Sequence, residues 1–115
     1  MSNDLARAVD RLSRIPGVRG ALVADAAAGV PVVESVADGV AGPAVVALAA
    51  SLYRCAAAAS ENAGLGAMGP VQVDAGAGHV IIIGAGDLLL VIVAEKGAQL
   101  GLLLLEAQRV AEALP

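Results

Sequence analysis

The stretch VIIIGAGDLLLVIV, residues 80–93, decides the fold of this chain. Two runs that are apolar at every position, Val80–Ile83 and Leu88–Val93, flank the segment Gly84–Asp87, which is typical of a hairpin turn. Strands that are apolar throughout are covered on both faces. The stretch therefore predicts two neighbouring strands inside a sheet that carries helices on both sides.

The segments outward from this hairpin complete the pattern. The other expected strands are Val18–Ala24, Val30–Val36 and Val71–Ala75, and the expected helices are Asp4–Arg14, Pro43–Ala63 and Ala98–Leu114. Direct links between strands are short, which favours antiparallel pairing. Pro31 cannot donate a ladder hydrogen bond, so its strand is expected at an edge. We expect an α+β fold, a three-layer α/β/α sandwich around five strands, in one domain over residues 1–115.

Composition and charge exclude several classes of function. Seven Lys and Arg against eleven Asp and Glu give a net charge of −4, and Tyr53 is the one aromatic residue, so we expect no nucleic-acid partner. Although 58% of the residues are apolar, the charge-free run Gly39–Tyr53 is shorter than the roughly 20 residues of a membrane span, and none is expected. The charged N-terminal segment does not resemble a signal core, so a cytoplasmic location is expected.

The predicted middle helix has two apolar faces. One face carries Val45, Leu48, Ala49, Leu52, Ala56 and Ala59, and we expect it to pack on the sheet. The second face lies where a helix over a single sheet is expected to be polar. Either small alanines are tolerated at the surface there, or a second subunit covers them. The strand Val71–Ala75 favours a second subunit, because it has no Pro or Lys to block pairing at its edge.

The second face and this strand supply the expected interface between two subunits. Its residues are Val46, Ala50, Tyr53, Ala57, Val71 and Val73. Arg54 and Glu61, on the flank of the helix, are expected at the polar rim or in contact with another partner. A charge at position 50 would be buried without a partner, so Ala50→Glu is expected to split the dimer.

Motifs that suggest chemistry stand in the wrong context. The glycine motif Gly64–Gly69 follows a helix and precedes a strand, the reverse of a dinucleotide site. The segment Gly84–Asp87 follows a strand but leads into another strand, so no helix N-terminus receives a phosphate. Cys55, expected at the margin of the core, and His79, expected at the surface, are the only Cys and His and are too few for a zinc site. We expect no catalytic, cofactor-binding or metal-binding residues.

Several segments, in their order and spacing, resemble the Roadblock/dynein light-chain domain family, which includes MglB-like bacterial regulators of small GTPases. These segments are Gly17–Val23 with Asp25, Gly29–Val32, the Ala-rich middle helix, Gly86–Val91 and Gln99–Gly101. The resemblance covers nearly the whole chain. It implies a five-stranded antiparallel sheet with the middle helix on one face and the terminal helices on the other. It also implies a homodimer joined through the middle helix and the third strand.

The resemblance further implies a non-enzymatic scaffold or regulator. Such a dimer docks a small Ras-like GTPase on its paired middle helices and modulates the nucleotide state or the location of that GTPase. It can do so by reordering the switch loops of the GTPase, without supplying an arginine finger. An alternative is a dimeric sensing module that holds an apolar ligand between its layers, although no cluster of convergent polar residues marks a ligand site.

Overall fold

The computed structural model describes residues 2–114, with side chains from residue 4 onward. Met1 and Pro115, which the expected domain includes, lie outside the described residues. The helices are α1 (Ser2–Ser13), α2 (Gly42–Asn62) and α3 (Leu100–Ala113), and the strands are β1 (Val18–Asp25), β2 (Val30–Val36), β3 (Val71–Ala75), β4 (Gly78–Ala85) and β5 (Leu88–Glu95). Every expected element is present, with its ends within two residues of the expected positions.

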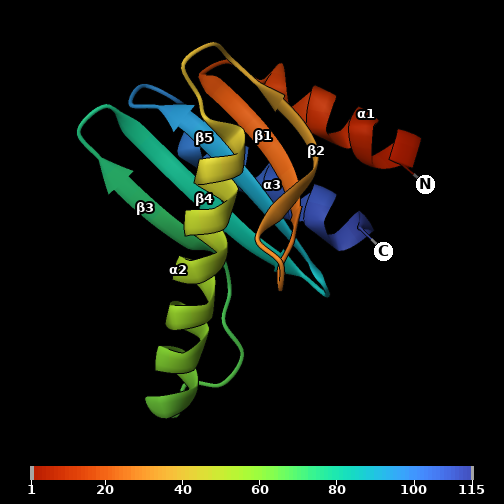
Figure 1. Cartoon of the computed structure of the whole chain (residues 1–115). Helices are drawn as coiled ribbons and strands as arrows, with labels where there is room; N and C mark the ends of the chain where they lie inside the picture. Colours follow the sequence, from red (N-terminus) through yellow and green to blue (C-terminus); the bar gives the residue numbers. More distant parts are fainter. Residues whose placement is uncertain (1, 115) are drawn as a thin grey trace.

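The five strands form one antiparallel sheet in the order β2-β1-β5-β4-β3 (Figure 1). β4 and β5 pair along their whole length around a tight turn in which Gly86 has a φ of 61°. Glycine adopts this left-handed conformation without steric cost, so the turn predicted from the sequence is confirmed and narrowed to two residues. Pro31 lies in the edge strand β2, as predicted.

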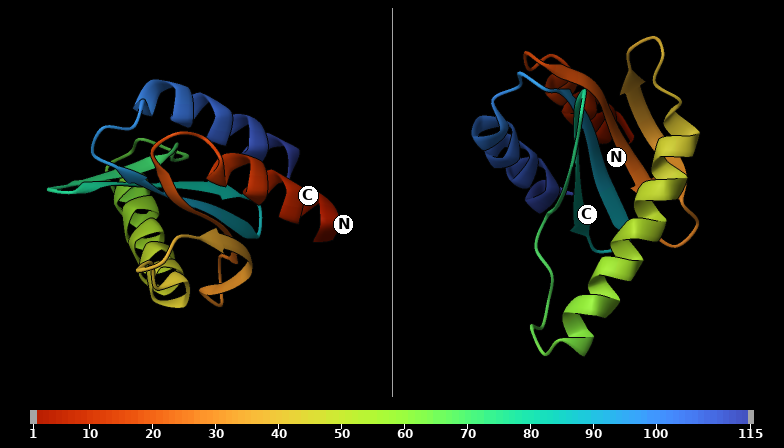
Figure 2. Two further views of the ribbon diagram at one scale, coloured as in Figure 1. Left: turned by 90° about the horizontal axis from the view of Figure 1, so that it is seen from above. Right: turned by 90° about the vertical axis from the view of Figure 1, so that its left-hand side faces the viewer.

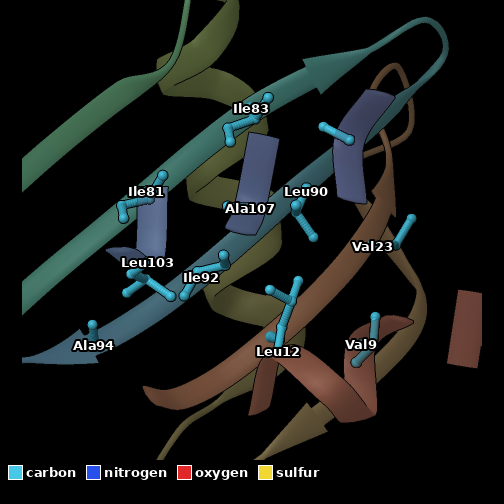
Figure 3. Close-up of a cluster of buried hydrophobic side chains, with 12 residues drawn as sticks. Val9, Leu12, Val23, Ile81, Ile83, Leu90, Ile92, Ala94, Leu103 and Ala107 are labelled. Atoms are coloured by element: carbon cyan, nitrogen blue, oxygen red, sulfur yellow. The ribbon is translucent and has the colours of Figure 1, made fainter. Parts of the chain in front are cut away.

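The two terminal helices cover one face of the sheet (Figure 2). Val9 and Leu12 of α1, and Leu103, Ala107 and Ala111 of α3, are buried there (Figure 3). Alternate residues of the inner strands meet them, because successive side chains of a strand point to opposite faces. These strand residues are Ala21, Val23, Ile81, Ile83, Leu90, Ile92 and Ala94.

α2 alone covers the opposite face, so the expected three-layer arrangement is confirmed. Its buried residues are Gly42, Val46, Ala49 and Ala50, all in the first half of the helix. They pack on the other alternate set of strand residues, Leu22, Ala24, Ile82, Leu89 and Val91. The second half of α2 runs past the end of the sheet (Figure 1). Beyond Tyr53 and Arg54, which still contact the rest of the domain, this half of the helix therefore has little contact with the sheet.

Among the described residues, α2 is the one helix long and apolar enough to cross a membrane, judged by length and composition alone. Core helices of globular proteins pass the same test. In this chain the first half of α2 packs on the sheet, and the second half carries Arg54 and Glu61. Both observations favour α2 as a layer of the domain over α2 as a membrane-spanning helix.

Candidate protein interaction site

The outer face of α2 carries an exposed apolar stripe. Leu48, Leu52, Cys55 and Ala59 are spaced four, three and four residues apart, which places them on one side of the helix. Leu48 is 72% exposed and Leu52 is 41% exposed, and the other two residues are exposed as well. We call these four residues the outer stripe. Large apolar side chains gathered in solvent are typical of an interaction surface.

The expected assignment of the two faces of α2 is wrong in part: Val45 and Ala49 pack on the sheet as expected, but other residues of the two faces are exchanged. Val46 and Ala50, expected to contact a second subunit, are 0% and 1% exposed and lie in the core. Leu48 and Leu52, expected against the sheet, face solvent. Small side chains on the inner face let the helix backbone lie close to the strands. The helix also contacts the turn between β1 and β2, since a Cβ added at Gly29 would lie in ordinary van der Waals contact, 3.6 Å, with the Cβ of Ala50.

Tyr53, Ala57 and Cys55 follow the same exchange. Tyr53 is half-buried and packs into the cluster beneath α2, with its phenol so close to Gly84 of β4 that an added Cβ would overlap it. A glycine inside a strand often marks such a close approach. Ala57 is half-buried, and Cys55, expected at the margin of the core, is exposed.

β3 provides an open edge beside this layer. Within residues 2–114, β3 pairs with β4 alone, so its outer backbone groups have no strand partner. Val71 and Val73 are half-buried, and Val71 packs into the cluster beneath α2. Because strand side chains alternate, Val73 points to the same face as Val71. An edge without blocking residues can pair with a strand of another chain.

Arg54 and Glu61, the expected rim residues, differ in their contacts: within the described residues, the side chain of Arg54 forms a hydrogen bond and that of Glu61 does not. Arg54 Nη1 donates a hydrogen bond to the carbonyl oxygen of Ala26, at 3.1 Å. The Asp25 carboxylate holds the same turn by accepting hydrogen bonds from the backbone N–H groups of Ala27 and Ala28, at 3.0 and 2.8 Å. Arg54 therefore ties α2 to the turn between β1 and β2. The exposed side chain of Glu61 makes no hydrogen bond or ion pair within the described part of the chain.

A polar cluster on the hairpin of β3 and β4 was not predicted. Asp74 Oδ1 accepts a hydrogen bond from Gln72 Nε2 at 2.8 Å and lies 2.7 Å from His79 Nδ1. Two hydrogen bonds hold the pKa of the Asp74 carboxyl below its ordinary value of 3.8: the one from Gln72 has the larger effect and the one with His79 the smaller. Asp74 and His79 lie opposite each other because they are paired in the register of β3 and β4. This register is the signal from which the contact could have been predicted.

The structure separates the residues that chemistry would need together. Cys55 lies on the outer surface of α2, whereas His79 points to the other side of the sheet, where Ile81 of the same strand packs under α3. In the described residues no group of three His, Cys, Asp or Glu side chains could hold a metal ion. Gly84 lies inside β4, so the glycine motif after the predicted strand belongs to a hairpin and does not lead into a helix.

Two hollows open at the surface. One, of about 420 Å³, lies between the loop before β3, the end of β4 and the end of α3. The other, of about 1320 Å³, lies between α1 and α3. The first is lined by residues of two layers, the sheet and α3, so the sensing alternative, which places an apolar ligand between layers, stays a prediction.

Solved structures share this fold at low sequence identity. The Roadblock/LC7 domain from Streptomyces avermitilis superposes with a TM-score of 0.85 at 21% identity, over 95% of this chain and 92% of that chain. The gliding protein MglB from Thermus thermophilus gives 0.86 at 22% identity, over 98% and 87%. A structure of MglB in a tetrameric arrangement gives 0.86 at 24% identity, over 97% and 85%. No curated protein matches the chain.

A family match covers the same elements. The model of the Roadblock/LC7 domain matches residues 5–94, from α1 to the end of β5. This range includes the sheet, the outer stripe of α2 and the open edge of β3. The sequence match and the shared architecture together show that this chain belongs to the Roadblock/LC7 domain family.

Proposed function

We propose that this chain is a cytoplasmic, non-enzymatic homodimer that docks a small Ras-like GTPase and modulates its nucleotide state or location. The observation that carries the proposal is the outer stripe of α2 beside the open edge of β3. Membership of the Roadblock/LC7 family supports it, as does the tetrameric arrangement of one structurally similar MglB.

In the proposed dimer, the two surfaces left open by the chain satisfy each other. The outer edges of two β3 strands pair and continue the sheet across the subunits. The outer stripes of the two α2 helices pack beside this junction. The two leucines of each stripe then leave water; burying a fully exposed leucine is worth about 1.5–3 kcal/mol, and Leu48, 72% exposed, contributes more of this than Leu52, 41% exposed.

The GTPase docks on the surface formed by the paired α2 helices. Glu61 is the better candidate for contact with it, because Arg54 already binds the turn between β1 and β2. The dimer acts by binding one arrangement of the switch loops of the GTPase more tightly than another. The hydrolytic chemistry stays in the GTPase, so the dimer needs no catalytic residue of its own.

Sedimentation velocity of Leu48→Glu tests the dimer. A carboxylate in the centre of the outer stripe would be buried without a partner at the interface, so we expect a folded monomer where the wild type is a dimer. Leu105→Glu is the matched control, because Leu105 is also an exposed leucine, 46% against 72%, but lies on α3. A Leu48→Glu variant that sediments as a dimer would contradict the proposal, as would a wild type that stays monomeric at every concentration.

Binding to a small Ras-like GTPase, loaded in turn with GDP and with a GTP analogue, tests the docking. We expect the wild type to prefer one nucleotide state, Leu48→Glu to lose binding, and Glu61→Lys to weaken binding while remaining a dimer. Glu95→Lys makes the same charge change at an exposed position at the end of β5 and should bind as the wild type does. Equal affinity for both nucleotide states, or full binding by the monomeric variant, would contradict the docking proposal.

A further inference from the structure

A groove of about 1320 Å³ runs between α1 and α3, on the face of the sheet opposite α2. The two helices lie side by side along it, with the N-terminus of one near the C-terminus of the other (Figure 2). Its apolar lining is formed by Leu5, Ala8, Leu12, Ile15, Pro16, Leu102, Val110, Ala113 and Leu114. Leu102 stays 48% exposed there. The groove is separate from the outer stripe and the edge of β3, and the proposed dimer leaves it open.

The walls of the groove favour a helix as its occupant. Both walls are α-helices, whose backbone N–H and C=O groups bond within the helix. An extended peptide would therefore bury its own backbone polar groups without partners in the walls. An amphipathic helix satisfies its backbone internally and offers an apolar stripe to the floor. The 12 residues of α1 correspond to roughly 18 Å, which suits a guest helix of about three turns.

The charges of the lining favour an acidic guest. The carboxylates of Asp10 and Glu106 are already paired with Arg14 and Arg109, at 3.1 and 3.3 Å. Asp4 is the other carboxylate of the lining. Two further cationic residues of α1, one helical turn apart, line the groove. They are Arg7 and Arg11, which are exposed and make no side-chain hydrogen bond or ion pair within residues 4–114.

The charge of the whole chain sharpens this contrast. The lining of the groove holds three of the seven Lys and Arg residues and three of the eleven Asp and Glu residues. The lining therefore carries no net charge, while the rest of the chain carries the whole net charge of −4. A guest with carboxylates beside its apolar stripe can pair in the groove with Arg7 and Arg11, which are free within residues 4–114, whereas the remaining, negatively charged surface repels it.

We infer that the groove between α1 and α3 is a docking site for an acidic amphipathic helix of a partner protein. The apolar stripe of this helix lies on Leu102 and the neighbouring apolar side chains, and its carboxylates pair with Arg7 and Arg11. The site gives each subunit a second contact surface, on the opposite side of the sheet from the surface proposed for the GTPase. A subunit can therefore hold a GTPase on one side and a tether or second partner on the other.

Titration of the full chain with a labelled model helix tests the site. The probe is a 14-residue fluorescein-labelled peptide with Leu at helical spacing and Glu on both flanks, compared with peptides that carry Gln or Lys in place of Glu. We expect fluorescence anisotropy to show binding of the Glu peptide that is at least about ten-fold tighter than that of the Gln peptide. Amide chemical shifts should change along α1 and α3 and stay unchanged along α2.

Variants locate the binding to the groove. Arg7→Glu/Arg11→Glu should weaken binding of the Glu peptide by about ten-fold or more and improve binding of the Lys peptide. Arg19→Glu/Lys96→Glu changes the net charge equally outside the groove and should bind nearly as the wild type does. Leu102→Ser should weaken binding, whereas Leu105→Ser, on the same helix but outside the lining, should not.

Three results would overturn the inference. The first is binding of the Gln or Lys peptide as tight as that of the Glu peptide, or no binding of any peptide. The second is an equal loss of binding in the groove variants and their matched controls. The third is a smaller assembly for Leu102→Ser than for the wild type at the same concentration in sedimentation, because a second copy of this chain would then occupy the groove. Monomeric Leu48→Glu should still bind the Glu peptide, so the dimer proposal can fail independently.

Discussion

Apart from Tyr53, the inner face of α2 carries smaller apolar side chains than the outer face, which is the reverse of what a helix that only covers a core would show. The inner face, against the sheet, is built from Val46, Ala49 and Ala50, while the outer face presents Leu48 and Leu52 to solvent. A helix that covers a sheet in a monomer normally buries its largest apolar residues. The difference indicates that the inner face favours close approach and the outer face favours contact with another chain.

The inner face shows its preference for close approach in its glycine contacts. An added Cβ at Gly29 would touch Ala50, and one at Gly84 would overlap Tyr53. Tyr53 is the large side chain of this face, and its phenol fits because the residue of β4 beneath it is Gly84, which has no side chain. The outer face has no such matching surface within the described chain.

The largest expected effect is that of Ala50→Glu, which breaks the inner face. Ala50 is buried, so the variant places an oversized and unpaired carboxylate against the sheet. We expect the free energy of unfolding in urea to fall by about 3–5 kcal/mol, or the chain to fail to fold. Ala58→Glu, at an exposed position of the same helix, should stay within about 0.5 kcal/mol of the wild type. A folded, monomeric Ala50→Glu would restore the original assignment of the faces.

The contact between Tyr53 and Gly84 is the next test of close approach. Gly84→Ala places a methyl group where the phenol lies, and we expect a loss of about 1–3 kcal/mol in the free energy of unfolding. In a Tyr53→Ala background the same change should cost much less, because the obstruction is gone. Additive losses in this double-mutant cycle would show that the ring does not press on β4 in solution.

The sequence predicted the elements well because their signals are local. The apolar runs on either side of Gly84–Asp87, and Pro31 in an edge strand, each depend on a few neighbouring residues. The faces of α2 could not be predicted in this way, since the helix is apolar on both sides and periodicity alone does not say which side meets the sheet. Side-chain size suggested Leu48 inside, and Gly84 within a strand was the overlooked signal of close approach. The contact between Asp74 and His79 required the register of two strands, which no local pattern supplied.

The outer face can be examined through the reactivity of its cysteine. Cys55 is exposed in the single chain, and the proposed dimer covers it. We expect its reaction with a chromogenic disulfide reagent to be at least about ten-fold slower at concentrations far above the dissociation constant of the dimer than far below it. Leu48→Glu should react quickly at every concentration. Slow labelling of the monomeric variant would show that Cys55 is buried within the chain, against the exchange of faces.

The smallest expected effect is on the stability of the hairpin that includes β3. Like α2, this strand has two different faces. Val71 and Val73 face the side of α2, while Gln72 and Asp74 face the other side and form hydrogen bonds at the surface. Because the folded pKa of Asp74 lies below 3.8, its ionised form stabilises the folded chain at higher pH, and this contribution is lost as the pH falls from about that value through the lowered folded pKa. Asp74→Asn should therefore lower the free energy of unfolding near neutral pH and converge with the wild type in acid. Urea unfolding of both proteins across this range measures the difference between the two curves, which isolates Asp74 from the other carboxylates that titrate in acid. A difference that is the same at every pH would mean that the hydrogen bonds to Asp74 stabilise the hairpin without regard to its charge.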